Sequence, residues 1–191
     1  MPRNIRQQTN PQHTMGSVCC FTGYRPQKLP WGSDESDARC IRVKIELARE
    51  ILNAYTAGFD RFLSGMAAGI DLLAAEIVLG LQKQLPLHLD AAIPYSGQAD
   101  YFTWEIKRRY QSVLKNCAHT DILSQQYDQN CMAASNRFMI ERSGRVIAVY
   151  DGQPGGTKNT LAYARKKEIE RVLIHPETGA VTYENMQQSL F

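Results

Sequence analysis

The sequence predicts an α/β fold in which a mainly parallel sheet lies between two layers of helices. Short apolar runs alternate with longer amphipathic segments along the chain, and the connections between them are short. The run Val146–Val149 is continuously apolar, as expected of a strand covered on both faces. Such alternation implies right-handed crossovers onto one sheet. The predicted class is therefore a Rossmann-like three-layer α/β/α domain.

The first half of the chain contains three expected strands and two expected helices. The apolar run 17–22 ends at Gly23 and predicts the first strand, and further strands are expected over 59–63 and 87–93. A helix is expected from Asp71 to Leu81. An apolar stripe at helical spacing predicts another helix before Gly58, and its members are Ile41, Ile45, Ala48, Leu52 and Tyr55.

The second half continues the alternation. Helices are expected over 99–115 and 129–143, and from Thr157 to about residue 167. The expected strands are 120–123, 145–150, 171–175 and an edge strand over 181–183.

Length and composition indicate one domain. The chain has 191 residues, 43% of them hydrophobic, and a formal net charge of +3. Residues 1–16 are polar and lack the apolar core of a secretion signal, so we expect a disordered tail followed by a single domain over residues 17–191. No run approaches the roughly 18 apolar residues of a membrane-spanning helix. Five cysteines without a Cys-x-x-Cys pair indicate no metal site and a reducing, cytoplasmic location.

Three loops at the carboxyl ends of predicted strands have an unusual composition. They are Thr22-Gly-Tyr-Arg-Pro26, Ser64-Gly-Met-Ala-Ala-Gly-Ile-Asp71 and Gly152-Gln-Pro-Gly-Gly-Thr157. Glycine lets the backbone approach an anion, and a helix N-terminus supplies free N–H groups. Tight turns alone would also need glycine, but three such loops at one sheet edge favour phosphate or nucleotide binding. The dinucleotide and P-loop fingerprints are both absent, which argues against an NAD dehydrogenase or a P-loop NTPase.

These loops, together with Asn136-Arg-Phe-Met-Ile-Glu-Arg-Ser143, resemble the YpsA-like branch of the SLOG superfamily. The resemblance covers about residues 17–176. It implies a Rossmann-like domain that binds a nucleotide-derived ligand related to ADP-ribose or NAD. Relatives in the superfamily include the LOG phosphoribohydrolases and the DNA-processing protein DprA.

The resemblance assigns candidate ligand-binding residues in each loop. They are Gly23 and Arg25 in the first, Ser64, Gly65, Gly69 and Asp71 in the second, and Gly155, Gly156 and Thr157 in the third. Arg25 offers a planar fork for phosphate or is a surface arginine. Asp71 binds ribose or caps its helix, and Thr157 likewise binds phosphate or caps the next helix.

A catalytic role has weaker support. LOG enzymes carry a glutamate shortly after their Pro-Gly-Gly loop, whereas this chain has Asn159 there, and an amide cannot act as a general base. Asp71 and Glu76 are the candidate substitutes for cleavage of a nucleotide N-glycosidic bond.

The expected partners are a small phosphorylated nucleoside and a second copy of the chain in a homodimer. A nucleic-acid partner is not expected, because the charge of +3 is only weak evidence for one and fits one small bound anion better than a polyanion, although it does not exclude a local basic groove. Single-stranded DNA binding stays as a third alternative, because Lys107-Arg-Arg109 lies near Tyr101, Phe102, Trp104 and Tyr110. On a helix, however, the core stripe contains Phe102, Ile106, Arg109 or Tyr110, and Val113, and it leaves the basic residues in solvent.

Overall fold

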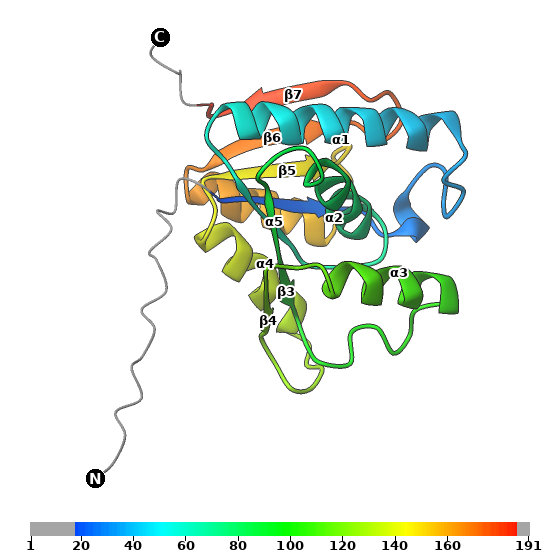
Figure 1. Ribbon diagram of the computed structural model, residues 1–191. Helices are drawn as coiled ribbons and strands as arrows, with labels where there is room; N and C mark the ends of the chain where they lie inside the picture. The colour runs from blue at the N-terminus through cyan, green and yellow to red at the C-terminus, as the bar shows by residue number, and fades with distance from the viewer. Residues whose placement is uncertain (1–17, 187–191) are drawn as a thin grey trace.

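A computed structural model describes residues 18–186 and places seven strands in one sheet (Figure 1). The strand order is β4-β3-β2-β1-β5-β6-β7. All neighbours pair in parallel except β6 and β7, which are antiparallel. The strands are β1 (Val18–Gly23), β2 (Arg61–Ser64), β3 (His88–Ile93), β4 (His119–Ile122), β5 (Arg145–Val149), β6 (Glu170–Ile174) and β7 (Val181–Glu184). The expected tail over residues 1–16 lies outside the described residues.

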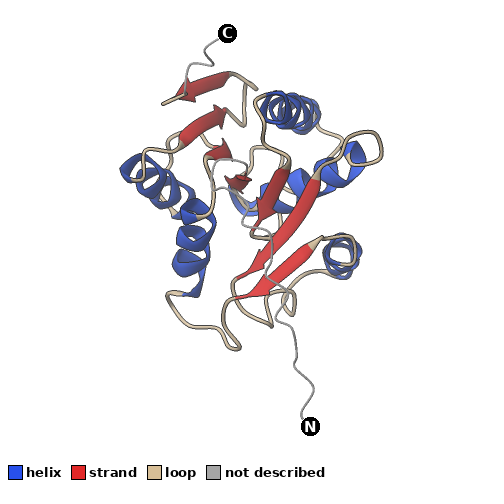
Figure 2. Ribbon diagram, turned by 60° about the vertical axis from the view of Figure 1, so that its left-hand side comes forward, coloured by secondary structure: helices blue, strands red, loops and turns tan. Residues whose placement is uncertain are grey.

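Helices cover both faces of the sheet, as Figure 2 shows. The α-helices are α1 (Ala38–Thr56), α2 (Ile70–Leu81), α3 (Trp104–Leu114), α4 (Cys131–Glu141) and α5 (Gly156–Lys166). Buried side chains of α1, α2 and α3 share one hydrophobic core, and those of α4 and α5 share another. This arrangement confirms the predicted three-layer Rossmann-like class.

The central strand β1 separates the two cores by the simple alternation of its side chains. Cys19 and Phe21 belong to the core under α1 to α3, whereas Val18 and Cys20 belong to the core under α4 and α5. Phe21 stacks on Phe62 of β2, with ring centroids 5.8 Å apart. The strand is therefore anchored on both faces, and its carboxyl end holds a fixed position.

The apolar stripe predicted for the first long helix is wrong. Ile41, Ile45 and Leu52 are 47%, 53% and 39% exposed. The face that α1 buries instead contains Cys40, Val43, Leu47, Ile51 and Ala54. Both faces carry apolar residues at helical spacing, so the pattern alone did not say which one meets the sheet.

The chain order of the strands creates a switch point between β1 and β5. After β1 the crossovers run outward through β2 and β3 to β4, and the chain then returns to the other side of β1 to form β5. In open α/β sheets, ligands bind outside the carboxyl ends of the strands at such a point. None of the helices within residues 18–186 is long and apolar enough to cross a bilayer.

Candidate functional site

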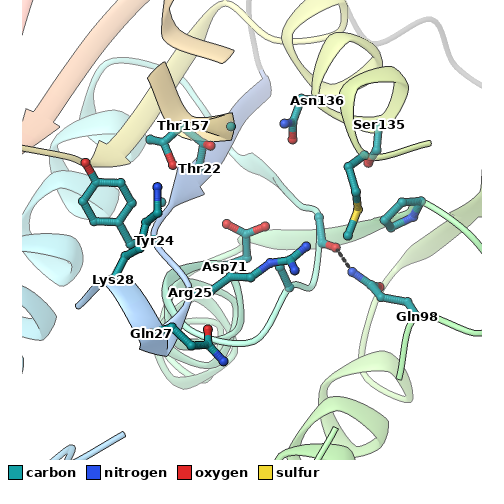
Figure 3. Close-up of a pocket in the computed structure, with 16 residues that line it drawn as sticks. Thr22, Tyr24, Arg25, Gln27, Lys28, Asp71, Gln98, Ser135, Asn136 and Thr157 are labelled. Carbon is teal, nitrogen blue, oxygen red and sulfur yellow. Dashed lines mark hydrogen bonds between the residues drawn. The ribbon is translucent and has the colours of Figure 1, made fainter. Parts of the chain in front are cut away.

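A cleft of about 340 Å³ opens at the switch point. It is lined by the loops that follow β1, β2 and β3 and by the first turns of α2, α4 and α5 (Figure 3). Asp71 and Arg25 lie side by side in its middle, and Thr157 and Gln98 lie toward opposite ends. The predicted sheet edge therefore carries a formed cavity into which polar side chains converge.

The loop after β1 is tied across the switch point to the loop after β5. The Tyr24 hydroxyl donates to Asp151 Oδ1 at 2.5 Å, and Lys28 Nζ donates to the carbonyl oxygen of Pro154 at 2.7 Å. Tyr24 is 4% exposed. These long-range contacts hold the two loops at a fixed separation, so the cleft between them is largely preformed.

Arg25 is an unpaired cation at the centre of the cleft. Its side chain is exposed and, across residues 18–186, makes no hydrogen bond or ion pair. It faces the Asp71 carboxyl closely enough to lower the pKa of that group. An arginine that leaves its planar fork of donors free inside a cleft is suited to bind an incoming phosphate or carboxylate.

Asp71 is a buried carboxyl in the first turn of α2. Burial raises the pKa of Asp71 from 3.8 to about 7, while the Ala67 N–H that donates to it and the nearby Arg25 act in the opposite direction. Its side chain lies so close to Gly65 that a Cβ there would meet Oδ2 at 2.9 Å. A carboxyl that changes charge near neutral pH inside a cleft is a candidate functional group.

The loop after β2 uses its donors internally. The Ser64 hydroxyl is fully buried, accepts from the Met66 N–H at 3.1 Å and donates to the Asp71 carbonyl at 2.9 Å. The Ile70 N–H donates to the Tyr24 carbonyl at 3.2 Å. Ser64 therefore shapes the loop from behind the cleft, and the N-terminus of α2 has few free donors left for an anion.

Two of the predicted glycines allow close packing of the first two loops. A Cβ on Gly69 would lie 2.5 Å from the Tyr24 carbonyl oxygen, and the φ of Gly69 is +103°. A Cβ on Gly23 would lie 2.5 Å from Cβ of Ile70. Gly23 also lines the cleft, whereas Gly69 does not.

The N-terminus of α5 is the open helix end of the site. Its N-cap Gly155 provides no side-chain cap. A Cβ on Gly156 would meet nothing within 4 Å, and Gly156 and Thr157 both line the cleft. The Thr157 hydroxyl makes no hydrogen bond among the described residues. This helix end therefore presents free N–H groups and a hydroxyl to the cleft.

Glu76 does not reach the cleft. Arg109 binds it through two hydrogen bonds, Nε to Oε1 at 2.8 Å and Nη2 to Oε2 at 2.6 Å, and also donates to Glu35 at 2.5 Å. The expectation that the basic residues of this helix are simply solvated is therefore wrong for Arg109. The bidentate pair joins α2 to α3 and gives Glu76 a structural role.

The predicted residues thus divide into two groups. The structure brings Gly23, Arg25, Gly65, Asp71, Gly156 and Thr157 to the cleft, while Ser64, Gly69, Gly155 and Glu76 lie outside its lining. Residues that sequence reasoning did not select also line it, and they include Thr22, Tyr24, Gln27, Lys28, Gln98, Ser135 and Asn136. Asn136 belongs to a motif already noted in the sequence, and Lys28 follows Arg25 by three residues. Both could therefore have been selected from the sequence as candidate site residues.

Gln98 is the least expected of these residues. It is 3% exposed, its Nε2 donates to the Gly65 carbonyl at 2.9 Å, and its Oε1 accepts from Tyr110 at 3.4 Å. It joins the turn after β3 to the loop after β2 and so forms a fixed wall of the cleft.

Comparison with known sequences places this architecture in a family. A family model named YpsA and described as the YspA SLOG family matches residues 19–178. The chain belongs to this family. UPF0398 proteins of Bacillus cereus strain B4264 and Bacillus thuringiensis strain Al Hakam are each 31% identical over 159 residues, which cover 80% of this chain and 85% of theirs. The resemblance inferred from the loops is therefore confirmed.

Solved structures of DNA processing protein A (DprA) share the fold of this YpsA-family domain. The Streptococcus pneumoniae protein matches with a TM-score of 0.55 at 17% identity over 83% of this chain. The Helicobacter pylori protein matches with a TM-score of 0.56 at 20% identity over 82% of this chain. The YpsA-family chain spans only 50% and 64% of these two chains.

The expectation that this fold has no nucleic-acid partner is wrong. The H. pylori DprA has a single-stranded DNA binding mode, so this fold serves at least one DNA-binding protein. A modest net charge does not exclude such binding, because local patches decide it. The net charge therefore gives no ground for excluding a nucleic-acid ligand.

Proposed function

We propose that this YpsA-family protein binds a phosphorylated nucleoside, such as ADP-ribose, in the cleft at the switch point. The observation that carries the proposal is the unpaired Arg25 guanidinium, which lies beside the buried Asp71 in a cleft that the open N-terminus of α5 also lines. A nucleotide fits this combination because it joins an anion to a sugar that bears hydroxyl groups.

Each group has a chemical role in this proposal. Arg25 donates two parallel hydrogen bonds to phosphate oxygens, and the N–H groups of Gly156 and Thr157 complete the anion site. Lys28 lines the same end of the cleft and adds positive charge. Asp71 accepts hydrogen bonds from ribose hydroxyls, as carboxylates at this edge of a Rossmann-like sheet can do.

Calorimetric titration with ADP-ribose, NAD and adenosine 5′-monophosphate tests the proposal. Arg25→Ala removes a charged hydrogen-bond donor and is expected to raise Kd by roughly 10-fold or more. Arg49→Ala is the matched control, because Arg49 is an exposed cation on α1 that pairs with Glu46 far from the cleft. If no nucleotide binds the wild-type protein, or if Arg25→Ala leaves Kd unchanged, the proposal fails.

Cleavage of an N-glycosidic bond is the enzymatic alternative, and it now depends on Asp71 alone because Glu76 lies outside the cleft. A carboxyl whose pKa is raised to about 7 can both accept and donate a proton at neutral pH. Release of free base from nucleoside monophosphates, lost in Asp71→Asn, would support this activity. A wild-type protein that releases no base would exclude it for these substrates.

Single-stranded DNA is the second candidate ligand, favoured by a basic hollow next to the cleft. This hollow, of about 560 Å³ between α4 and α5, is lined by Arg137, Tyr163 and Lys166. It shares Met132, Asn136 and Gly156 with the cleft, so the two form one trough. Cations beside aromatic rings suit a single strand. A labelled oligonucleotide whose anisotropy rises at low salt and falls with added salt would support it, and a flat signal would refute it.

A further inference from the structure

A second hollow joins the cleft on the side of α3. Its volume is about 720 Å³. Five residues line both cavities, namely Arg25, Gln27, Ala67, Gln98 and Met132. A single ligand can therefore extend from the cleft into this hollow without crossing a wall, and Arg25 lies at the junction.

Three aromatic side chains lie in the walls of this second hollow. Tyr95, Tyr101 and Phe102 all line it. Phe102 is held edge-on by Tyr110, with ring centroids 5.7 Å apart, and Tyr95 is held edge-on by Tyr127 at 5.3 Å. Two of the three rings are therefore fixed before any ligand arrives.

Tyr101 differs from its two neighbours because nothing covers it. It is 90% exposed, and within residues 18–186 it makes no hydrogen bond or ring contact. A large aromatic ring that the fold leaves in water at the edge of an aromatic hollow gains little from intramolecular packing. It can gain from a planar partner, since stacked ring pairs are favourable beyond the area they bury.

We propose that the second hollow is a subsite for a planar ring, so that the ligand is a nucleotide whose base packs against Tyr101 and Phe102 while its phosphate lies at Arg25. The proposal rests on the proposed function and adds the class of group that the neighbouring cavity takes. An aliphatic chain would offer no hydrogen bonds to the polar lining residues Ser33 and Glu105, whereas a base carries edge groups that can reach them.

Glu105 guides the choice of probe. Its carboxylate is exposed at the start of α3 and makes no hydrogen bond in the part of the chain that the structure describes. A carboxylate accepts hydrogen bonds, so it suits a base with an exocyclic amino group. Adenosine 5′-monophosphate is therefore the first probe, and ribose 5-phosphate is the matched ligand without a base.

Calorimetry with these two ligands on wild-type protein, Tyr101→Ala and Trp104→Ala tests the subsite. Trp104 is 68% exposed on the same helix region but does not line the hollow, so it is the control for loss of a surface aromatic. We expect wild-type protein to bind the nucleotide more tightly than the sugar phosphate. Tyr101→Ala should weaken nucleotide binding at least about fivefold and leave sugar phosphate binding unchanged. Trp104→Ala should change neither.

The outcomes separate this inference from the proposed function. Equal Kd values for the two ligands, or nucleotide binding unaffected by Tyr101→Ala, would overturn the ring subsite while the phosphate site stands. Absence of any binding, or ligand binding unaffected by Arg25→Ala, would overturn the proposed function and the subsite together.

The base can come from a free nucleotide or from a nucleic-acid strand. An oligodeoxyadenylate that competes far better than the mononucleotide, and loses this advantage in Tyr101→Ala, would support the ring subsite and identify a strand as the source. Competition no better than that of the mononucleotide would identify the free nucleotide.

Discussion

Replacing Asp71 by asparagine should stabilise the protein, and the gain should grow with pH. The carboxyl has a pKa of about 7 in the folded chain against 3.8 for an ordinary aspartate, because burial penalises its charged form. Between these two values the folded state holds a proton that the unfolded state has lost, so the free energy of unfolding falls as pH rises. Above pH 7 the folded state bears the full free-energy cost of the charged, buried carboxylate.

The magnitude follows from the shift. One pKa unit corresponds to about 1.4 kcal/mol, so a shift from 3.8 to about 7 costs the wild-type protein about 4 kcal/mol above pH 7. In Asp71→Asn the side-chain amide oxygen can still accept from the Ala67 N–H, and the side chain carries no charge at any pH. The stability gap between Asp71→Asn and wild type should therefore widen by about 3 kcal/mol from pH 5 to pH 8. For a domain of this size that is on the order of 10 °C in Tm.

Thermal unfolding followed by circular dichroism at pH 5, 6, 7 and 8 measures this gap. Asp100→Asn is the control, because the Asp100 side chain is 70% exposed on the surface. It should show no widening. Parallel stability curves for wild type and Asp71→Asn across the four pH values would contradict the raised pKa of Asp71, since they would mean that Asp71 is charged in the folded protein at pH 5.

Three further substitutions test the division between cleft and scaffold, and a fourth tests a buried ion pair. Gly156→Phe points into open space, so titration should show loss of nucleotide binding with an unchanged Tm, whereas Gly69→Ala meets the Tyr24 carbonyl at a positive φ and should lower stability by roughly 1–3 kcal/mol in urea unfolding. Glu76→Gln should leave the Kd for nucleotide unchanged in calorimetry, because its carboxylate is bound by Arg109 outside the cleft. Arg145→Ala breaks a buried pair with Glu170, in which Nη2 lies 2.6 Å from Oε2, and should cost about 3–5 kcal/mol in urea unfolding. Unchanged binding in Gly156→Phe, weakened binding in Glu76→Gln or an unchanged urea midpoint in Gly69→Ala or Arg145→Ala would each contradict the assignment.

The order and type of the elements could be predicted because local pattern decides them. The strands and helices lie within a few residues of their expected positions, and the largest difference is the start of α3. Turns occupy residues 96–101, and Thr103 then caps the helix with its hydroxyl, which accepts from the Ile106 N–H. An apolar pattern does not separate such turns from the helix that follows.

Whether each glycine-rich loop leaves its N–H groups free for a ligand could not be predicted, because contacts between distant residues decide it. The Ile70 N–H is taken by the Tyr24 carbonyl, 46 residues earlier in the chain, and the Tyr24 hydroxyl is taken by Asp151, 127 residues later. The sequence therefore located three glycine-rich loops but did not show that the second is largely closed and the third is open. The aromatic hollow was hidden for the same reason, since the segment between β3 and α3, the helix α3 and the loop after β1 form it together.

Titration of wild-type protein and Arg25→Ala with ADP-ribose, NAD and adenosine 5′-monophosphate decides whether the cleft binds a nucleotide. The cleft geometry predicts saturable binding of at least one of them to wild-type protein and a Kd raised roughly 10-fold or more by loss of the guanidinium. Binding of equal strength to both proteins, or no binding to either, would contradict the assignment of this cleft as a nucleotide site.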